Sequence, residues 1–489
     1  MPIQKLLSAD SIQPVSYTHL DVYKRQYKLY SGWETHIELK TKTKIFCGCA
    51  SEFGGNPNSR CCEICMGMPG TLPAVNKKVI EYAVMAGAAL GCKINSISYM
   101  DRKHYFYPDL PKAYQITQYQ KPICGEGKVA LPSGKIIRIK RIHIEEDAGK
   151  LLNKNQEVFI DYNRAGVPLI EIVTEPDFNS AEEIREYIEF IRLLMKYLGI
   201  SDCKMQEGSL RCDVNVSVMS DNGAMGTPTE IKNLNSVSYI MKAVKKEFSR
   251  QKELLSSGKI VSRVTLNYDD KKDMLYISRS KEDSADYRYF REPDLYKIEL
   301  NDNEIKNILR LLPESPLIRY KRFISLGVSQ EYAKNIISYK RISDFLDSLS
   351  HKTVCLQNAA VLIISCLFPI LNENEREEFS FEAKTDFIKL LYMLDNNEIS
   401  ISMAKRLLSE ALNKKISVEF LLKNMNSEAI DIDSLCKKVI KNNEQSVKEY
   451  LTGKEKALNF LIGCAMRESK GVFEAEKIKQ KIINALYKY

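Results

Sequence analysis

The feature that most constrains the fold is a change in the spacing of apolar residues near Pro293. Before this point, several short runs alternate apolar and polar residues, which is typical of strands with one buried face. After it, apolar residues recur at helical spacing, and no glycine occurs from position 328 to 452. Because glycine weakens helices, its absence favours packed helices. We therefore predict a mixed α/β region followed by a helical region.

The first region contains several predicted strands and one clear helix. Trp33 to Leu39 alternates strictly, and the runs 158–162, 169–174 and 211–219 give further strands. Between these strands, Ser180 and Glu183 form a predicted capping box before an apolar stripe that ends at Gly199. Since helices do not alternate regularly with strands, we predict an α+β fold with an antiparallel-rich sheet.

The change in periodicity also suggests domain boundaries. Residues 1–26 resemble translated vector or adapter sequence, with a native disordered leader as the alternative, and are left out of the fold. We predict an α/β domain at 27–296, an all-α domain at 297–400 and a small all-α tail at 401–489.

Positive charge is concentrated in the tail. The 489-residue chain has a net charge of +9. The segment from Lys437 to Lys488 holds twelve basic and six acidic residues, hence +6. A basic helical tail suits a polyanion partner, and the alternative is a solvated helical surface.

Two close pairs of cysteines give the strongest local motif. Cys47 and Cys49 precede Cys62 and Cys65, with a glycine- and asparagine-rich loop between the pairs. This arrangement is typical of a tetrahedral zinc site, in which four thiolates leave no open position, so the role would be structural. Cys61 is a further cysteine that could compete with Cys62 as a zinc ligand. The alternative is a set of free cysteines in a reducing cytosol, the compartment that the cysteine usage favours.

A second pattern places acidic side chains on predicted strands. Glu34, His36 and Glu38 share one face of the first strand, and other acids occur in the segments 143–147, 207–215 and 230–232. Oxygen ligands with one imidazole suit Mg²⁺ or Mn²⁺, which in turn hold nucleotide phosphates. The alternative is a solvated sheet face.

A third pattern interleaves basic and aromatic residues from Asp101 to Gln115. Such a segment can line a groove for phosphates and stacked bases, or it can be a loop packed by its own tyrosines. The chain has no Walker loop, dinucleotide fingerprint or amidase-type serine motif, and no apolar run long enough to span a membrane.

Read together, these segments resemble the B subunit of the bacterial aspartyl/glutamyl-tRNA(Asn/Gln) amidotransferase. The resemblance runs from Tyr27 to the C-terminus. The segments that carry it are 32–39, 69–73, 101–118, 143–150, 163–171, 206–215, 230–236, 286–290, 443–447 and 453–460.

The resemblance implies a cradle-like α/β domain, a helical domain and a helical tail. It implies that the cradle uses ATP to phosphorylate the side-chain carboxylate of Glu-tRNA(Gln) or Asp-tRNA(Asn), and that ammonia then displaces phosphate. It also implies two partners, an amidase subunit that frees ammonia from glutamine and a small third subunit, and no membrane. Whether one or both misacylated tRNAs are substrates stays open.

Within this framework we assign residues to roles. The first expected magnesium ligands are Glu34, His36 and Glu146, and the second are Glu207 and Asp213. Arg211 and Lys232 are expected to bind negatively charged phosphate groups. The residues expected to bind tRNA are Arg102, Lys103, Tyr105, Lys112, Lys454, Lys456 and Lys470.

Two other classes of protein remain as alternatives. A zinc-knuckle RNA-binding factor without catalysis would explain the cysteines and the basic tail but not the acidic strands. A synthetase-like ligase that acts alone would need adenylate-forming motifs, which the sequence lacks. ATP hydrolysis that depends on misacylated tRNA separates the three classes.

Overall fold

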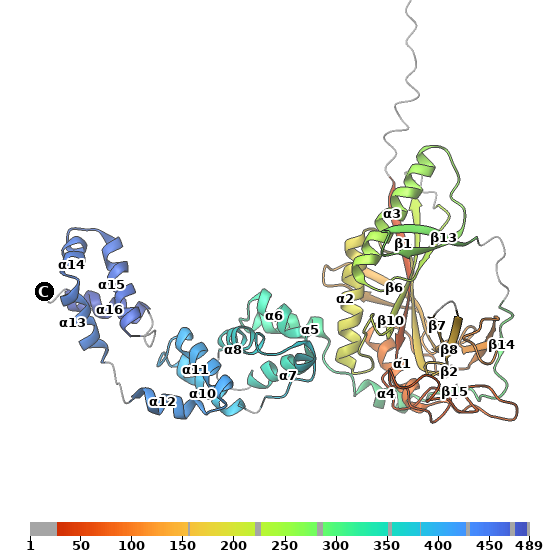
Figure 1. Ribbon diagram of the computed structural model, residues 1–489, viewed down its shortest axis with the longest axis horizontal. Helices are drawn as coiled ribbons and strands as arrows, with labels where there is room; N and C mark the ends of the chain where they lie inside the picture. The colour runs from red at the N-terminus through yellow and green to blue at the C-terminus, as the bar shows by residue number, and fades with distance from the viewer. Residues whose placement is uncertain are drawn as a thin grey trace, which may run out of the picture. The chain divides into compact units, whose positions relative to one another are not determined.

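A computed structural model describes residues 27–154, 157–220, 226–280, 287–350, 355–381, 383–426, 431–469 and 475–486. The predicted leader at 1–26 lies outside this range. The chain divides into two compact units, Met1–Ser315 and Pro316–Tyr489. The first is rich in sheet and the second is helical, as the change in periodicity predicts (Figure 1). The boundaries proposed at 296/297 and 400/401 stay predictions.

An eight-stranded sheet forms the centre of the first unit. Its strands run in the order β13-β12-β11-β10-β1-β9-β6-β5. All neighbouring pairs are antiparallel except β11 and β12. The bounds are β1 Lys28–Glu38, β5 Gly127–Ala130, β6 Ile136–Glu146, β9 Pro168–Thr174, β10 Leu210–Met219, β11 Thr229–Lys232, β12 Val264–Asp269 and β13 Met274–Ser280.

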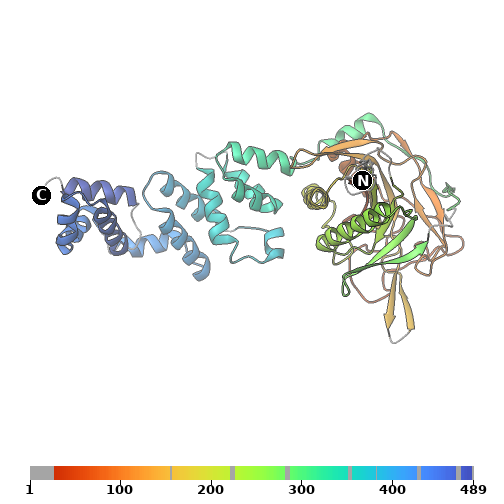
Figure 2. The ribbon, with the colours of Figure 1, turned by 90° about the horizontal axis from the view of Figure 1, so that it is seen from above.

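Smaller strands build the surroundings of this sheet. β3 (Asp101–His104) pairs with β4 (Tyr114–Thr117) and β14 (Phe290–Arg291), while β2 (Ile97–Ser98) pairs with β15 (Ile298–Glu299). β7 (Lys150–Lys154) and β8 (Glu157–Asp161) form a hairpin that projects from the unit (Figure 2).

Helices cover the apolar face of the large sheet. α2 (Ala181–Leu198) and α3 (Val237–Ser256) lie side by side there, and α1 (Lys77–Ala89) packs against β6 (Figures 1 and 2). Trp33 of β1 is buried beneath them, with its ring 6.1 Å from that of Phe178. The Ser180 hydroxyl caps α2 by accepting from the Glu183 amide, but the Glu183 carboxylate accepts from Asn179, so the predicted reciprocal bond to Ser180 is wrong. A short helix, α4 (Asp302–Leu309), packs against α1.

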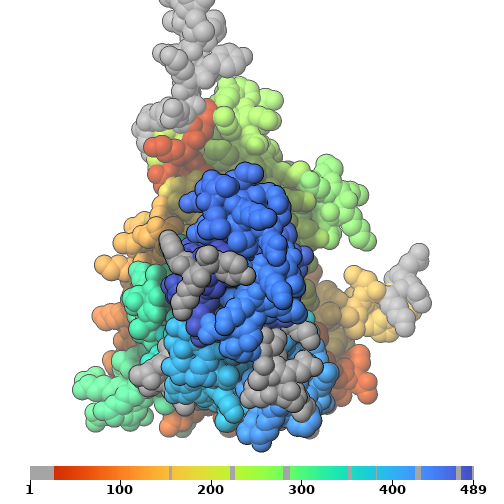
Figure 3. Space-filling model, turned by 90° about the vertical axis from the view of Figure 1, so that its left-hand side faces the viewer, coloured from red at the N-terminus to blue at the C-terminus, as the bar shows by residue number. Residues whose placement is uncertain are grey.

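The second unit consists of short helices. They are α5 Pro316–Ser325, α6 Gln330–Ile337, α7 Lys340–Leu349, α8 Leu356–Leu362, η2 Ile363–Leu367, α9 Glu373–Glu377, α10 Lys384–Asp395, α11 Ile401–Lys414, α12 Val418–Asn426, α13 Ile432–Asn442, α14 Glu444–Leu451, α15 Glu455–Glu468 and α16 Ala475–Leu486. The last four share their own core, which includes Val439, Leu461 and Ile482. Figure 3 shows these tail helices in blue as a space-filling surface. Among the described residues, no helix combines the length and apolarity needed to cross a membrane.

Candidate active site

The face of the large sheet opposite the helices carries a set of polar side chains. Because side chains alternate along a strand, Glu34 and His36 project to the face opposite Trp33, as predicted. The register then places Asp213 of β10 beside Glu34 and Glu171 of β9 beside His36. Five adjacent strands, β11, β10, β1, β9 and β6, contribute acids or histidines to this face.

One group on this face consists of His36, Glu145 and Glu171. One ligand atom from each lies within 4.8 Å of the others. His36 Nε2 is 3.5 Å from Glu145 Oε1 and 3.4 Å from Glu171 Oε2. Burial lowers the pKa of His36, but the charges of Glu171 and Glu145 outweigh burial and raise it to about 9. Burial raises the pKa of Glu171, but the charges of His143 and His36 outweigh burial and hold the carboxyl pKa well below its usual range.

A second group consists of Glu34, Asp213 and Glu230, whose ligand atoms also lie within 4.8 Å of one another. Burial raises the pKa of Glu34, and the negative charges of Glu171, Asp213 and Glu230 raise it further. Three carboxylates at this spacing repel one another, so the group is suited to holding a cation.

Basic side chains border the two groups. Arg211 Nη2 is 2.7 Å from Asp147 Oδ2, and Lys232 Nζ is 2.6 Å from Asp213 Oδ2. Burial lowers the pKa of Lys232, but the charges of Asp213 and Glu230 reverse this and raise it. A cavity of about 340 Å³ opens here. The residues that line it include His36, Lys103, Tyr105, Glu145, Arg211, Asp213 and Lys232.

The burial of these acids argues against a merely solvated sheet face. Glu145 is 4% exposed, Glu171 8% and Glu230 8%. Carboxylates are rarely buried to this extent unless they are paired or bind metals. These three acids are therefore not a solvated sheet face: Glu145 and Glu171 pair with His36 and His143, and Glu230 pairs with Lys232.

Two of the predicted ligands lie outside these groups. Glu146 points to the opposite side of β6 from Glu145. There a carboxylate oxygen lies 2.6 Å from Lys112 Nζ, and another accepts from the Ile116 amide. Glu207 precedes β10 and pairs with Lys204 at 2.9 Å. The structure does not bring the predicted set of Glu34, His36 and Glu146 together, because Glu145 and Glu171 lie beside His36, and the ligand assignment stays a prediction.

The residues predicted to bind tRNA lie in different environments. Lys103 and Tyr105 line the cavity. Arg102 makes a bidentate ion pair with Glu292 at 2.7 Å, and Lys112 is held by Glu146, so neither side chain lies free in a groove. Of the tail lysines, Lys454 lies 3.7 Å from Glu449 and Lys456 is exposed, while Lys470 lies outside the described residues.

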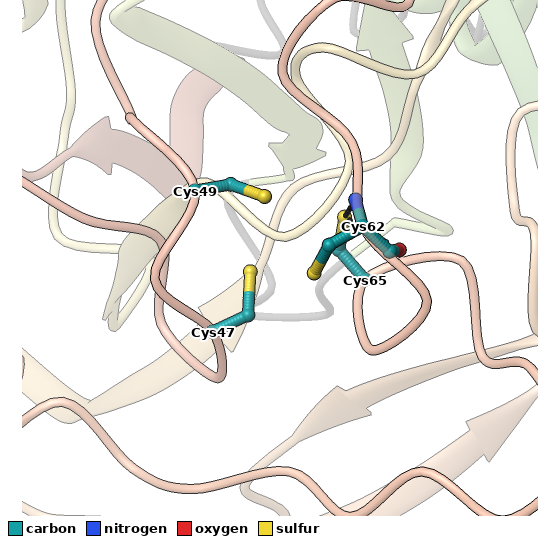
Figure 4. Close-up of side chains that lie close together, drawn as sticks. All are labelled: Cys47, Cys49, Cys62 and Cys65. Carbon is teal, nitrogen blue, oxygen red and sulfur yellow. Dashed lines mark hydrogen bonds between the residues drawn. The ribbon is translucent and has the colours of Figure 1, made fainter.

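The four cysteines of the two pairs converge in space. Cys47 and Cys49 come from one loop and Cys62 and Cys65 from another, and their sulfur atoms point toward a common centre (Figure 4). The four Sγ atoms lie within 4.8 Å of one another. Cys61, the possible competitor of Cys62, is not in this group, and its Sγ lies 4.0 Å from Asn163 Oδ1. The cluster is able to hold a metal ion.

Three acids of the site, Glu145, Glu171 and Glu230, were not among the assigned ligands. Glu171 is the one charged residue in the apolar strand β9, and Glu230 is the one carboxylate of β11, two residues before Lys232. A lone carboxylate in a buried strand is the signal that points to such residues. Glu145 and Glu146 are the same residue type, and alternation along β6 separates them, since Glu145 shares the face of His143.

The fold and these groups define an α+β protein with a candidate cation site on its main sheet. The GatB/GatE catalytic domain family matches residues 29–306, and the GatB domain family matches residues 344–486. The B subunit of the aspartyl/glutamyl-tRNA(Asn/Gln) amidotransferase from Ruminiclostridium cellulolyticum is 45% identical over 90% of this chain and 93% of its own length. The corresponding protein from Thermoanaerobacter sp. is 44% identical over 91% and 96%, and that from Caldicellulosiruptor saccharolyticus 42% over 95% and 100%. The chain belongs to the family of aspartyl/glutamyl-tRNA(Asn/Gln) amidotransferase B subunits.

Proposed function

We propose that this chain, as the B subunit of a tRNA-dependent amidotransferase, activates the side-chain carboxylate of Glu-tRNA(Gln) or Asp-tRNA(Asn) on the polar sheet face. The activation uses ATP, and ammonia from glutamine then replaces phosphate to give the amide. This proposal rests on the two groups of potential ligands, the one around His36 and the one around Asp213. Both groups contribute side chains to the same cavity.

The donor sets fit divalent cations such as Mg²⁺ or Mn²⁺. Glu34, Asp213 and Glu230 offer only oxygen, and His36 joins two carboxylates in the other group. Bound cations would neutralise the phosphoryl oxygens of ATP during transfer to the substrate carboxylate. Like-charged carboxylates buried together also gain a compensating charge in this way.

Acidic neighbours fix the basic side chains of the cavity in positions where they can bind an anion. Asp147 fixes Arg211, while Asp213 and Glu230 fix Lys232. Lys103 enters from β3, with its ammonium 4.9 Å from the Tyr287 ring centre. Because acidic neighbours hold these cations in place, they can orient phosphate groups with little loss of side-chain entropy.

The acceptor end of the tRNA is proposed to reach the same cavity. Tyr105 offers an aromatic face there beside Lys103, a combination that suits a stacked base and its phosphate. Lys454 and Lys456 lie on the exposed surface of the basic tail, where they would meet the tRNA backbone away from the acceptor end.

The cysteine cluster is proposed to hold one structural Zn²⁺. Four thiols at this mutual distance match a closed tetrahedral site. Hydrogen bonding from the Cys47 thiol lowers the pKa of Cys65, burial opposes this, and the Cys62 amide lowers it further, which favours a thiolate. The metal would fix two loops and take no part in the chemistry.

Glutamine hydrolysis is assigned to a partner. The chain has no amidase-type nucleophile motif, so it is proposed to act with an amidase subunit and a small third subunit. The purified chain alone is expected to release no ammonia from glutamine. Release of ammonia by this polypeptide in the absence of partners would contradict the division of labour.

The proposed activity is tested by replacing one acid inside the site and one outside it. Asp213→Asn should lower phosphate release from ATP in the presence of misacylated tRNA by about 10²-fold, because it removes a cation ligand. Glu207→Gln is the matched control, since Glu207 pairs with Lys204 outside the cavity, and it should remain near wild type. Both variants are assembled with the partner subunits. Equal phosphate release by Asp213→Asn and wild type would refute the assignment.

A further inference from the structure

Lys44 is a buried lysine beside the cysteine cluster. The residue is 0% exposed, and its ammonium lies 3.7 Å from Cys65 Sγ and 3.4 Å from the carbonyl oxygen of Tyr162. Its stem runs against Gly166, where an added Cβ would come within 3.6 Å of Lys44 Cδ. The ammonium therefore lies between the cluster and the turn before β9.

Lys44 contacts both halves of the cluster. Its backbone amide donates to the Cys49 carbonyl at 2.9 Å in the first loop, and its side chain reaches Cys65 in the second. Lys44 therefore links the two loops that carry the four cysteines.

The charge of Lys44 has an unusual environment. Among the described residues, no carboxylate forms an ion pair with it, although Glu146 and Lys112 line the same cavity of about 190 Å³. An ammonium buried without negative charge is strongly unfavourable. Among the described residues, the Lys44 ammonium has the Cys65 sulfur and the Tyr162 carbonyl as hydrogen-bond partners. Of these two, only the sulfur can carry a negative charge that compensates the ammonium.

We propose that Lys44 is the positioning residue that balances the charge of the metal-bound thiolates at Cys47, Cys49, Cys62 and Cys65. This inference rests on the zinc site proposed above. A zinc ion with four thiolates carries a net charge of −2, and the adjacent ammonium reduces it to −1 while donating a hydrogen bond to Cys65. Lys44 thereby strengthens metal binding and makes the thiolates weaker nucleophiles.

The experiment compares metal binding by the purified full chain and its variants. Cobalt(II) replaces zinc, because a tetrahedral thiolate site then gives visible absorption that reports both ligand set and dissociation constant. Lys44→Met keeps the length of the side chain and removes its charge. Lys42→Met is the control, since Lys42 is exposed two residues away.

Lys44→Met should keep the tetrahedral cobalt spectrum and raise the dissociation constant about tenfold or more, as substitutions beside metal ligands commonly do. It should also speed alkylation of the metal-bound thiolates by iodoacetamide. Lys42→Met should match wild type. If Lys44→Met fails to fold by circular dichroism, Lys44→Gln, which is neutral but can donate a hydrogen bond, should show the same weakening.

Two negative results are distinguishable. Wild-type protein that binds neither zinc nor cobalt would overturn the metal site itself and this inference with it. Wild-type protein that binds cobalt with the same dissociation constant and alkylation rate as the folded Lys44 variant would overturn the role of Lys44 alone.

Discussion

Glu145 and Glu146 are adjacent in sequence but lie on opposite sides of β6, so their glutamine variants separate two kinds of defect. Glu145 Oε1 lies 3.5 Å from His36 Nε2 on the polar face. Glu146 instead binds Lys112 on the side that faces the cysteine cluster. Glutamine keeps the size of each side chain and removes its charge.

The two variants should differ in which quantity changes most, the rate of phosphate release or the free energy of unfolding. Glu145→Gln removes one cation ligand, which should slow phosphate release about 10²-fold, equivalent to about 2.7 kcal/mol of transition-state stabilisation. Its stability should fall less than that of Glu146→Gln, because Glu171 still pairs with both His36 and His143. Glu146→Gln leaves the Lys112 ammonium, with a side chain 9% exposed, without its carboxylate. Breaking such a buried pair costs about 3 kcal/mol of the free energy of unfolding, while phosphate release should fall less than tenfold.

The assay measures both quantities on the same preparations. Phosphate release is followed with the assembled complex, ATP and Glu-tRNA(Gln), and unfolding of the isolated chain is followed in urea. Glutamine hydrolysis without tRNA is the control that the complex has assembled, and it should be unchanged by Glu145→Gln. The reasoning is refuted if Glu146→Gln slows phosphate release as much as Glu145→Gln and leaves the stability unaltered.

Three further predictions concern the metal, the tail and pH. Wild-type protein should contain one zinc per chain by mass spectrometry of the metal, and Cys62→Ser should lose it whereas Cys61→Ser should retain it. Deleting residues 431–489 should raise the KM for tRNA about tenfold and reduce the salt dependence of binding, by about one unit of slope for each phosphate that the tail neutralises, with glutamine hydrolysis unaffected. Because the pKa of His36 rises from 6.5 to about 9 on folding, its contribution to stability is fully present below about pH 6.5 and is lost as the pH rises through 9. In metal-free buffer, the difference in unfolding free energy between wild type and His36→Gln should shrink over that interval, and a constant difference would contradict the assignment.

The sequence predicted the polar face of β1 because alternation is a local property of a strand. Glu34 and His36 stand at alternate positions, and the structure places both on the same face with Asp213. The four cysteines were also predictable, since two close pairs at this spacing are typical of a metal site. In the structure their four sulfur atoms lie close together. In both cases the pattern is complete within a short segment.

The remaining ligands depend on pairing between distant segments. Glu171 meets His36 because β9 pairs with β1 in one particular register. The choice between Glu145 and Glu146 depends instead on alternation within β6, where His143 and Glu145 share one face and Ile144 and Glu146 the other. The register shift of β6 lies before this stretch, between Ile139 and Arg141, and does not alter the alternation. Local alternation therefore separates the two acids, whereas the contact of Glu145 with His36 follows from the order of the strands in the sheet.

The strand β6 separates two chambers, with Glu145 facing one and Glu146 the other. Because the side chains of a strand alternate, inserting or deleting a single residue between Arg141 and Glu145 would exchange the sides on which these two carboxylates lie. It would carry Glu145 to the cysteine side and take Glu146 away from Lys112. We expect the length of this segment to be invariant among natural homologues.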